Sequence, residues 1–382
     1  MSKSMHLLTI VGARPQFIKA AAISRTIDTE FIGRIRESVL HTGQHYDSNM
    51  SRIFFDEMSM REPDVQLNVG SAAHGTQTAQ MLEGIEQALL KLTPDALLVY
   101  GDTNSTLAGA LAAAKLGVAV VHVEAGLRSF NKSMPEEINR ITADHCSSLL
   151  FSPTPKGIEN LVSEGFSDRK EGPATIDRPV LYECGDVMLD NALHFRDLAK
   201  DKTSFLDEIG LREVKFALCT IHRPQNTDDP KKLQNILEGL IGIGLDLDLK
   251  IAFPVHPRTK IKLNTAGDHI QELINHERFV FLQPASYIDM LTLEHNCEIV
   301  LTDSGGVQKE AFFAKKPCVV MRPETEWVEL VDNGNAILSD SDADRMQKAA
   351  SDLMKAQLTF PNFYGDGKAA SFICQKILEH LS

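Results

Sequence analysis

The chain has 382 residues, of which 43% are hydrophobic and 24% are charged, and its formal net charge is −13. At about 150 residues per domain, this length predicts two or three domains, with two favoured, and the apolar content excludes intrinsic disorder as the main state. An acidic surface repels phosphate backbones, which argues against a nucleic-acid-coating role but leaves room for a small phosphorylated ligand. No apolar run approaches the roughly 20 residues that a membrane helix needs, so we expect no membrane insertion.

The spacing of the cysteines indicates the cellular compartment and disfavours a zinc knuckle. Six of them are scattered along the chain without a Cys-x-x-Cys pair: Cys146, Cys184, Cys219, Cys297, Cys318 and Cys374. This spacing disfavours a zinc knuckle and a disulfide scaffold, and it favours the reducing cytoplasm. The stretch Met1–Ile10 has the pattern of a strand and lacks the cleavage site of a signal peptide. We therefore expect a cytoplasmic protein.

In the first half of the chain, short apolar runs alternate with amphipathic stretches. Strands are expected at His6–Val11, Ser38–His41, Asp95–Tyr100, Val118–Val123, Ser148–Ser152 and Val180–Cys184. Helices are expected at Gln16–Asp28, Thr76–Lys91, Thr103–Lys115 and Pro135–Cys146. This alternation is typical of βα units on a parallel sheet. A charged, aperiodic loop at Ser167–Arg178 indicates a domain boundary nearby.

The alternation restarts after a long helix expected at Val187–Leu206. Further strands are expected at Phe216–Ile221, Lys250–Pro254, Val280–Leu282, Ile299–Leu301 and Pro317–Val320. The helices between and after them are expected at Lys231–Ile243, Ile288–His295, Val307–Ala314, Asp342–Lys355 and Ala369–Leu381.

The sequence therefore predicts an α/β protein with two Rossmann-like, doubly wound domains that face a cleft. We expect the first domain at residues 1–185, completed by a C-terminal helix at 366–382, and the second at residues 186–365. Ligands of such folds bind just beyond the carboxyl ends of the strands, so the residues at these strand exits are the candidate site.

The first strand exit carries Gly12-Ala13-Arg14-Pro15, with Lys19 one turn into the following helix. A helix N-terminus presents N–H groups, and Arg14 and Lys19 add two cations, so the motif predicts a pyrophosphate grip. The alternative is a capped helix with surface cations. Neither a Walker loop nor the Gly-x-Gly-x-x-Gly dinucleotide fingerprint occurs, which disfavours a nicotinamide enzyme.

Three acids, Asp102, Glu124 and Glu136, stand at or near successive strand exits of the first domain. Each has a structural alternative, since Asp102 stands where a helix N-cap belongs and the helix dipole favours acids such as Glu136 in a first turn. Their convergence on one cleft is the informative feature, because carboxylates in one dry pocket suit proton abstraction and return.

In the second domain, His222 and Arg223 follow a strand, and a His-Arg pair at a strand exit favours a functional role. The turn Ser304-Gly305-Gly306 allows backbone N–H groups to approach an anion, and Glu310 on the next helix can accept hydrogen bonds from ribose hydroxyls. A nucleotide diphospho-sugar fits this layout, with the nucleotide on the second domain and the sugar on the first.

Taken together, these motifs resemble the non-hydrolysing UDP-N-acetylglucosamine 2-epimerases. The likeness rests on Gly12–Pro15, Gly101–Ser105, His122–Arg128, Pro135–Arg140 and Asp303–Gly306. It implies a two-domain fold like that of the GT-B glycosyltransferases, a homodimer, no metal or nicotinamide, and conversion of UDP-GlcNAc to UDP-ManNAc.

The resemblance also assigns roles to residues. The family's catalytic positions fall on Asp102, Glu124, Glu136 and His222. Its UDP-binding positions fall on Arg14, Lys19, Ser304, Gly305, Gly306 and Glu310, and we add Arg140 and Arg223 as substrate-binding candidates. We expect loss of UDP from C1 together with the C2 proton, giving a 2-acetamidoglucal, followed by re-addition of UDP and protonation from the other face. Asp102 and Glu136 would handle the proton, Glu124 would tune or relay it, and His222 would assist the leaving phosphate.

Some alternatives stay open at this point. A GT-B glycosyltransferase, a hydrolysing epimerase and a sugar-nucleotide sensor would share the nucleotide site. Gly12–Gln16 together with Glu324–Glu329 resembles epimerases of modified sugars such as UDP-2,3-diacetamido-glucuronic acid, whose extra carboxylate Arg128 or Arg258 would serve. The segment Gln44–Asp47 departs from bacterial members that bind a second, activating UDP-GlcNAc, so we do not expect that allosteric site.

Overall fold

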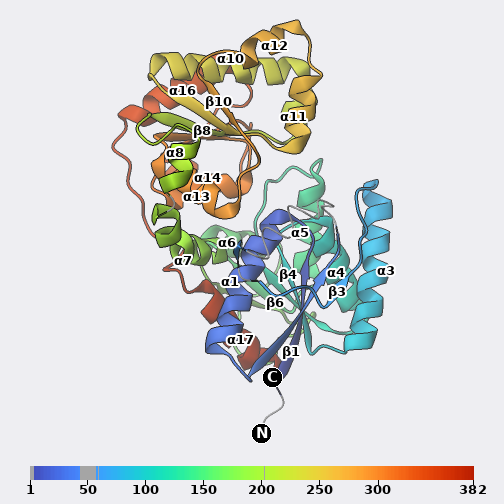
Figure 1. The fold of residues 1–382 in the computed structure, drawn as a ribbon. Coiled ribbons are helices and arrows are strands. Elements are labelled where there is room, and N and C mark those ends of the chain that lie inside the picture. The colour runs from blue at the N-terminus through green and yellow to red at the C-terminus, as the bar shows by residue number, and fades with distance from the viewer. Residues whose placement is uncertain (1–3, 44–56, 59, 202) are drawn as a thin grey trace. The chain divides into compact units, whose positions relative to one another are not determined.

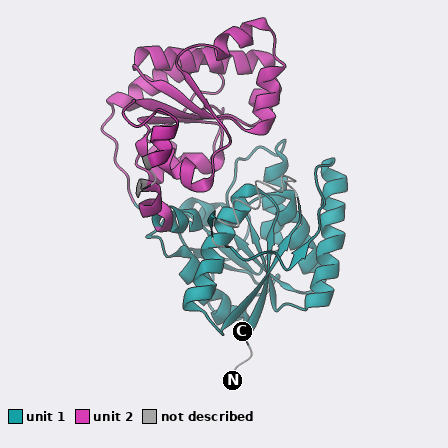
Figure 2. Ribbon diagram, viewed as in Figure 1, with its two compact units in different colours: residues 1–193, 362–382 teal, residues 194–361 magenta. Residues whose placement is uncertain are grey.

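The computed structural model describes residues 4–43, 57, 58, 60–201 and 203–382, and the segment Gln44–Asp47 lies outside them. The chain divides into two compact units, residues 1–193 with 362–382 (unit 1) and residues 194–361 (unit 2), coloured separately in Figure 2. Each unit is built on its own parallel sheet, and in the described residues its strands largely alternate with helices along the chain (Figure 1). The predicted fold class of two doubly wound α/β domains is confirmed.

Unit 1 contains a seven-stranded sheet in the order β3-β2-β1-β4-β5-β6-β7. Its strands are β1 (Met5–Val11), β2 (Ile35–His41), β3 (Val65–Gln66), β4 (Ala96–Tyr100), β5 (Ala119–Val123), β6 (Leu149–Ser152) and β7 (Val180–Glu183). Its helices are α1 (Arg14–Glu30), α3 (His74–Leu92), α4 (Asn104–Lys115), α5 (Pro135–His145), α6 (Pro155–Ser163), the N-terminal part of α7 (Val187–Asp201) and α17 (Ala369–Leu381). Every ladder is parallel.

Strand β1 shows why the core strands are continuous apolar runs. All seven of its residues are buried, because helices cover both faces of the sheet. Leu8 and Ile10 pack into the cluster formed with α3 and α4. Side chains alternate along a strand, so Thr9 points to the opposite face, where its hydroxyl donates to the buried Glu37 at 2.5 Å.

Unit 2 contains a six-stranded sheet in the order β10-β9-β8-β11-β12-β13. Its strands are β8 (Phe216–Thr220), β9 (Lys250–Pro254), β10 (Phe279–Leu282), β11 (Ile299–Thr302), β12 (Cys318–Val320) and β13 (Ala336–Leu338). Its helices are α8 (Thr203–Glu208), α9 (Pro224–Thr227), α10 (Pro230–Asp246), α11 (Pro257–Asn264), α12 (Asp268–Ile274), α13 (Tyr287–Asn296), α14 (Gly305–Phe313), α15 (Val328–Asp332) and α16 (Ala343–Lys355). One core of this unit joins β8, β9 and β11 to the apolar faces of α10 and α16.

The C-terminal helix α17 returns to unit 1 and packs against α1 (Figure 1). Asp190 of α7 holds its first turn, since the two carboxylate oxygens accept from the backbone N–H groups of Ala369 and Ala370 at 3.2 and 2.8 Å. Burial raises the pKa of the Asp190 carboxyl to about 6, although both N–H donors act to lower it.

This raised pKa predicts a pH-dependent stability. A carboxyl whose pKa is higher in the folded state stabilises the fold at low pH, and that contribution is lost as the pH rises through about 6. We expect wild-type protein to lose up to about 3 kcal/mol of unfolding free energy relative to Asp190→Asn, which cannot titrate, between pH 4 and 7. Urea unfolding of both proteins at several pH values measures this difference. Parallel pH profiles would contradict it.

Among the described residues, every helix falls short of the length and apolarity that crossing a bilayer requires.

Candidate functional site

In each sheet the strand order reverses at one place, between β1 and β4 in unit 1 and between β8 and β11 in unit 2. Ligands of open α/β sheets bind at the carboxyl ends of the strands beside this reversal. In unit 1 the exits carry Gly12 after β1 and Gly101 after β4. In unit 2 they carry His222 shortly after β8 and Asp303 directly after β11. The topology thus selects one candidate region in each unit.

The two exits of unit 1 are held together by Gln16, a buried side chain of α1 that the sequence did not single out. Its Oε1 accepts from the backbone N–H groups of Gly12 and Ala13 at 2.9 and 3.1 Å. Its Nε2 donates to the carbonyl of Tyr100 at 3.1 Å and to Thr106 Oγ1 at 3.0 Å. The N–H groups of Gly12 and Ala13 are therefore satisfied by the protein itself. The side chain of Arg14, at the next position, is half-buried.

Gly12 has no room for a side chain. A Cβ on this residue would lie 2.2 Å from Ser105 Oγ and 2.2 Å from Thr42 Oγ1. These two hydroxyls bond each other at 2.9 Å, so neither can simply turn away. Glycine at this position therefore reflects tight packing of the exits against each other.

Asp102 follows Gly101, and its side chain is 30% exposed. The N-cap of α4 is Thr103, whose hydroxyl accepts from the backbone N–H of Thr106, so the structural alternative for Asp102 is wrong. Instead, Asp102 Oδ2 pairs with Arg140 Nη2 of α5. Arg140 is buried and also pairs with Glu137 at 2.9 Å. The structure thus places Arg140 as the residue that fixes the Asp102 carboxylate.

Glu124 follows β5, next to β4, and pairs with Lys19 of α1. Lys19 Nζ lies 2.5 Å from Glu124 Oε1, and the two side chains are only 8% and 11% exposed. The paired atoms also lie close to Gly101. A Cβ added to this glycine would lie 3.2 Å from Lys19 Nζ and 3.3 Å from Glu124 Oε1. Glu124 has a φ of +71°, a conformation that costs a non-glycine residue about 1–3 kcal/mol and that often occurs at functional sites.

Of the two acids at the start of α5, Glu136 is exposed and Glu137 is buried. Glu137 accepts from the backbone N–H groups of Ser129 and Phe130 at 3.0 and 2.9 Å, which fixes the preceding loop. Glu136 lies one turn before Arg140 and hence on the same face of α5. It therefore projects from the helix face whose arginine holds Asp102.

His122, on β5, braces the Gly101 turn from inside the unit. Its Nε2 lies 2.8 Å from the carbonyl of Gly101, and its Nδ1 lies 2.7 Å from Asp144. Asp144 pairs in turn with Arg128 at 2.7 Å. Burial alone would raise the pKa of the Asp144 carboxyl, but His122 and Arg128 together lower it. Arg128 is committed to this network and to Glu164, so it does not offer its charge to a ligand.

In unit 2, the buried Asp303 organises the turn after β8. Its carboxylate accepts from the backbone N–H groups of His222 and Arg223, and His222 Nδ1 lies 3.2 Å from Oδ1. Burial alone would raise the pKa of the Asp303 carboxyl, but the hydrogen bond and charge of His222, with donors from Arg223 and Asn226, hold it below its usual range. The imidazole of His222 is 41% exposed, and Arg223 is half-buried.

The glycine turn of unit 2 lies beside His222. Ser304 is the N-cap of α14, and its backbone N–H is taken by Thr302 Oγ1 at 2.9 Å. Gly305 and Gly306 begin the helix, where the first N–H groups lack intrahelical acceptors. A Cβ on Gly305 would lie 2.4 Å from Glu326 Oε1, so a larger residue there would displace the end of the Glu326 side chain.

Charges gather around this turn. Glu326 pairs with the buried Arg322 at 3.0 Å, which offsets the negative charge close to Gly305. Lys309 of α14 lies 4.0 Å over the ring of Trp327. Glu310, the predicted ribose acceptor, lies on the same helix and is 7% exposed. Arg258 pairs with the exposed Asp228 at 2.7 Å.

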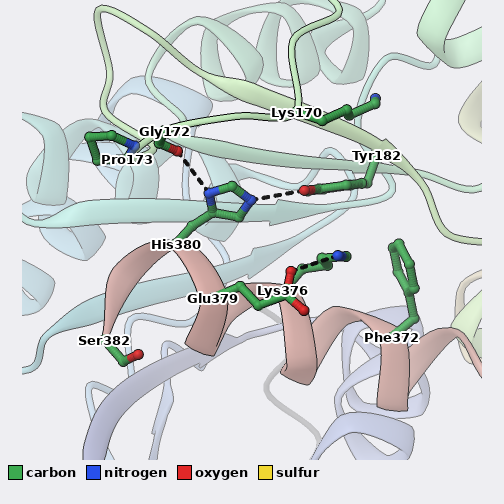
Figure 3. A pocket seen from close by; sticks show the side chains of 9 residues that line it. All are labelled: Lys170, Gly172, Pro173, Tyr182, Phe372, Lys376, Glu379, His380 and Ser382. Atoms are coloured by element: carbon green, nitrogen blue, oxygen red, sulfur yellow. Dashed lines mark hydrogen bonds and ion pairs between the residues drawn. The ribbon is translucent and has the colours of Figure 1, made fainter.

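A separate pocket of unit 1 contains none of the predicted site residues (Figure 3). It is lined by Lys170, Gly172, Pro173, Tyr182, Phe372, Lys376, Glu379, His380 and Ser382. His380 of α17 links the Tyr182 hydroxyl at 2.8 Å to the carbonyl of Gly172 at 3.0 Å. Lys170 and Lys376 lie 5.0 and 5.2 Å from the centre of the tyrosine ring, and each also pairs with a carboxylate. These contacts tie α17 to the loop before β7.

Comparison with known proteins agrees with this picture. Residues 30–378 match the family model described as UDP-N-acetylglucosamine 2-epimerase. The chain is 44% identical over 96% of its length to a UDP-N-acetylglucosamine 2-epimerase homolog of Methanococcus maripaludis, of which it covers 97%. It is 45% identical over 97% of its length to a UDP-2,3-diacetamido-2,3-dideoxy-D-glucuronate 2-epimerase of Pseudomonas aeruginosa, of which it covers 99%.

Among solved structures, the chain is similar to the UDP-GlcNAc 2-epimerase of Methanocaldococcus jannaschii in complex with UDP-GlcNAc and UDP. The TM-score is 0.89 at 38% identity, and the match covers 98% of this chain and 100% of the other. The match includes both units, in agreement with the GT-B-like fold class.

Proposed function

The chain belongs to the UDP-N-acetylglucosamine 2-epimerase family, and we propose that it inverts C2 of a UDP-2-acetamido sugar without hydrolysing it. The substrate is UDP-GlcNAc, which gives UDP-ManNAc, or a modified relative such as UDP-2,3-diacetamido-glucuronic acid. Within the chain, the supporting observation is the pair of acids beside Gly101, Asp102 paired with Arg140 and Glu124 paired with Lys19, at the strand-order reversal of unit 1.

The chemistry explains why carboxylates are needed. The C2 proton is not next to a carbonyl, so it becomes acidic only as the C1–O bond to UDP breaks. In the proposed step, a carboxylate takes the C2 proton, the C1–O electrons leave with UDP, and a 2-acetamidoglucal forms. Re-addition of UDP to C1 and protonation of C2 from the opposite face give the epimer, with no net change in composition.

For the individual residues, we propose that Asp102 and Glu136 handle the C2 proton. Asp102 is fixed in place by Arg140, as a proton-transfer group must be, and Glu136 is exposed on the same face of α5. Glu124 tunes or relays the transfer of this proton through its contact with Lys19. Arg14 and Lys19 remain candidates for binding the diphosphate. Lys19 would bind it while it also pairs with Glu124.

In unit 2, we propose that the first N–H groups of α14, together with Ser304, bind the diphosphate, with Arg223 nearby and Glu310 accepting from the ribose. His222 assists the leaving phosphate because its imidazole combines exposure with a fixed orientation. Gly305 and Gly306 allow close backbone approach at the start of a helix whose dipole favours negative charge.

We also propose that the protein is a cytoplasmic homodimer, as the family resemblance implies. All six cysteines are free, which favours a reducing compartment.

The direct test is proton NMR of UDP-GlcNAc and UDP-2,3-diacetamido-glucuronic acid, each incubated with the protein in deuterium oxide. We expect one of them to gain deuterium at C2 and to form its C2 epimer, with UDP still attached and with no acceptor added. Release of free ManNAc and UDP would identify a hydrolysing enzyme, whereas a glycosyltransferase would leave C2 unchanged. Absence of turnover with both sugars would overturn the proposed function.

A further inference from the structure

Asp303 gathers the turn between β8 and α9 around one buried carboxylate. Besides the two backbone N–H groups of His222 and Arg223, it accepts from Asn226 Nδ2 at 3.1 Å. The residue is 0% exposed, and it reaches these donors because β8 and β11 are neighbours at the strand-order reversal. The carboxylate is thus built into the frame that presents His222.

The imidazole of His222 also contacts the Asp303 carboxylate, with Nδ1 3.2 Å from Oδ1. An ionised carboxylate only accepts hydrogen bonds, so this contact favours the tautomer with the proton on Nδ1, in which Nε2 of the neutral ring carries none. In the described part of the chain, Nε2 has no hydrogen-bond or ion-pair partner, and the side chain is 41% exposed. The Asp303 contact thus involves one ring nitrogen and leaves Nε2 available.

His122 of unit 1 provides the contrast. It also pairs with a buried aspartate, but both of its ring nitrogens face protein acceptors, Asp144 and the carbonyl of Gly101. It is 0% exposed, so it can only brace the backbone. Of these two His–Asp pairs, His222–Asp303 leaves one nitrogen for a ligand.

We propose that Asp303 is a positioning residue of the epimerase, which holds His222 in the Nδ1–H tautomer and so leaves Nε2 for the leaving diphosphate. This inference rests on the proposed function of His222. When Nε2 binds a proton from solvent, the carboxylate compensates the charge of the ring, and the Nε2–H group then donates a hydrogen bond to the phosphate oxygen that gains charge as C1–O breaks. The Nε2–H bond forms with the proton from solvent, and no other bond within the protein forms or breaks in this step.

The first test needs no turnover. Long-range proton–nitrogen NMR of protein labelled with ¹⁵N-histidine reports which ring nitrogen of neutral His222 carries the proton. We expect the Nδ1–H tautomer in wild-type protein and in Asn226→Ala, which removes another donor from the same carboxylate. We expect a shift toward the Nε2–H tautomer in Asp303→Asn, and an Nε2–H tautomer in wild-type protein would overturn the proposal.

A double-mutant cycle tests whether Asp303 acts through His222. We expect Asp303→Asn to lower kcat by about 100-fold, His222→Gln by at least as much, and the double variant no more than His222→Gln alone. Asn226→Ala serves as the matched control and should retain most of the wild-type kcat. Losses that multiply in the double variant would overturn the proposal.

The outcomes separate this inference from the proposed function. A wild-type protein that epimerises no UDP-sugar contradicts the proposed function, while the tautomer measurement still decides the role of Asp303. If Asp303→Asn does not fold, as circular dichroism would show, the tautomer of His222 in wild-type protein and in Asn226→Ala decides instead.

Discussion

Replacing Asp102 by Asn is expected to reduce solvent-deuterium exchange at C2 by about 1,000-fold or more, because an amide cannot accept the C2 proton. The shape of the side chain is preserved, and its oxygen can still accept from Arg140, so the fold should persist. The side chain of Asp102 is 30% exposed, so loss of its charge should affect stability by only about 1 kcal/mol. Proton NMR of the UDP-sugar in deuterium oxide measures the exchange.

A matched control is Asp168→Asn, the same chemical change at a carboxylate that is 51% exposed and pairs with Lys170. This variant should exchange C2–H at the wild-type rate. An Asp102→Asn protein that exchanges almost as fast as wild type would remove Asp102 from the mechanism. In that event Glu136→Gln, tested in the same assay, would show whether the acid on α5 acts alone.

Breaking the Lys19–Glu124 pair is expected to give the largest loss of stability among the site variants. Lys19→Met removes the cation 2.5 Å from a carboxylate that is only 11% exposed. Removing one partner of a buried pair typically costs about 3–5 kcal/mol, because the remaining charge is poorly solvated. We expect a loss near the lower end of that range, measured by urea unfolding, together with loss of epimerisation.

The double variant Lys19→Met/Glu124→Gln separates stability from catalysis. Both charges are then gone, so most of the lost stability should return. Activity should not return, because Glu124 is proposed to tune or relay the proton. Recovery of activity together with stability would show that the pair only supports the fold, whereas additive stability losses would show that the two side chains are not coupled.

The alternation of apolar runs and amphipathic stretches was sufficient to predict the two sheets, because parallel strands buried on both faces are continuous apolar runs. Short edge elements were missed. Strand β3 contains only Val65 and Gln66, and β13 only Ala336–Leu338, so neither gives a detectable period. The helix expected at Val187–Leu206 falls on α7 and α8.

The candidate site was predicted less completely, since strand exits identify residue types but not their partners. Gln16 and Asp303 lie within the quoted motifs or next to them, yet their bonds join turns 84 and 81 residues apart. Likewise, the spacing of Arg140 does not reveal that its guanidinium holds Asp102. A long polar side chain at a strand exit beside the strand-order reversal is a signal that could have drawn attention to Gln16.

Neighbouring acids show the same limit. Glu136 and Glu137 are the same residue type at adjacent positions in a first helical turn, so the sequence alone does not distinguish them. Only Glu137 is buried and fixes the loop at Ser129. The helix period distinguishes them only once the orientation of α5 on the sheet is known.

Cleavage of the bond between C1 and UDP is the central step of the proposed epimerisation. UDP-GlcNAc, or the diacetamido sugar if that is the substrate, can be labelled with ¹⁸O at the oxygen bridging C1 and the β-phosphorus. If UDP departs and returns, rotation of the free phosphate must move the label into the non-bridging positions, at a rate tied to deuterium entry at C2. Phosphorus NMR detects this movement. Epimerisation with the label still wholly bridging would contradict the account.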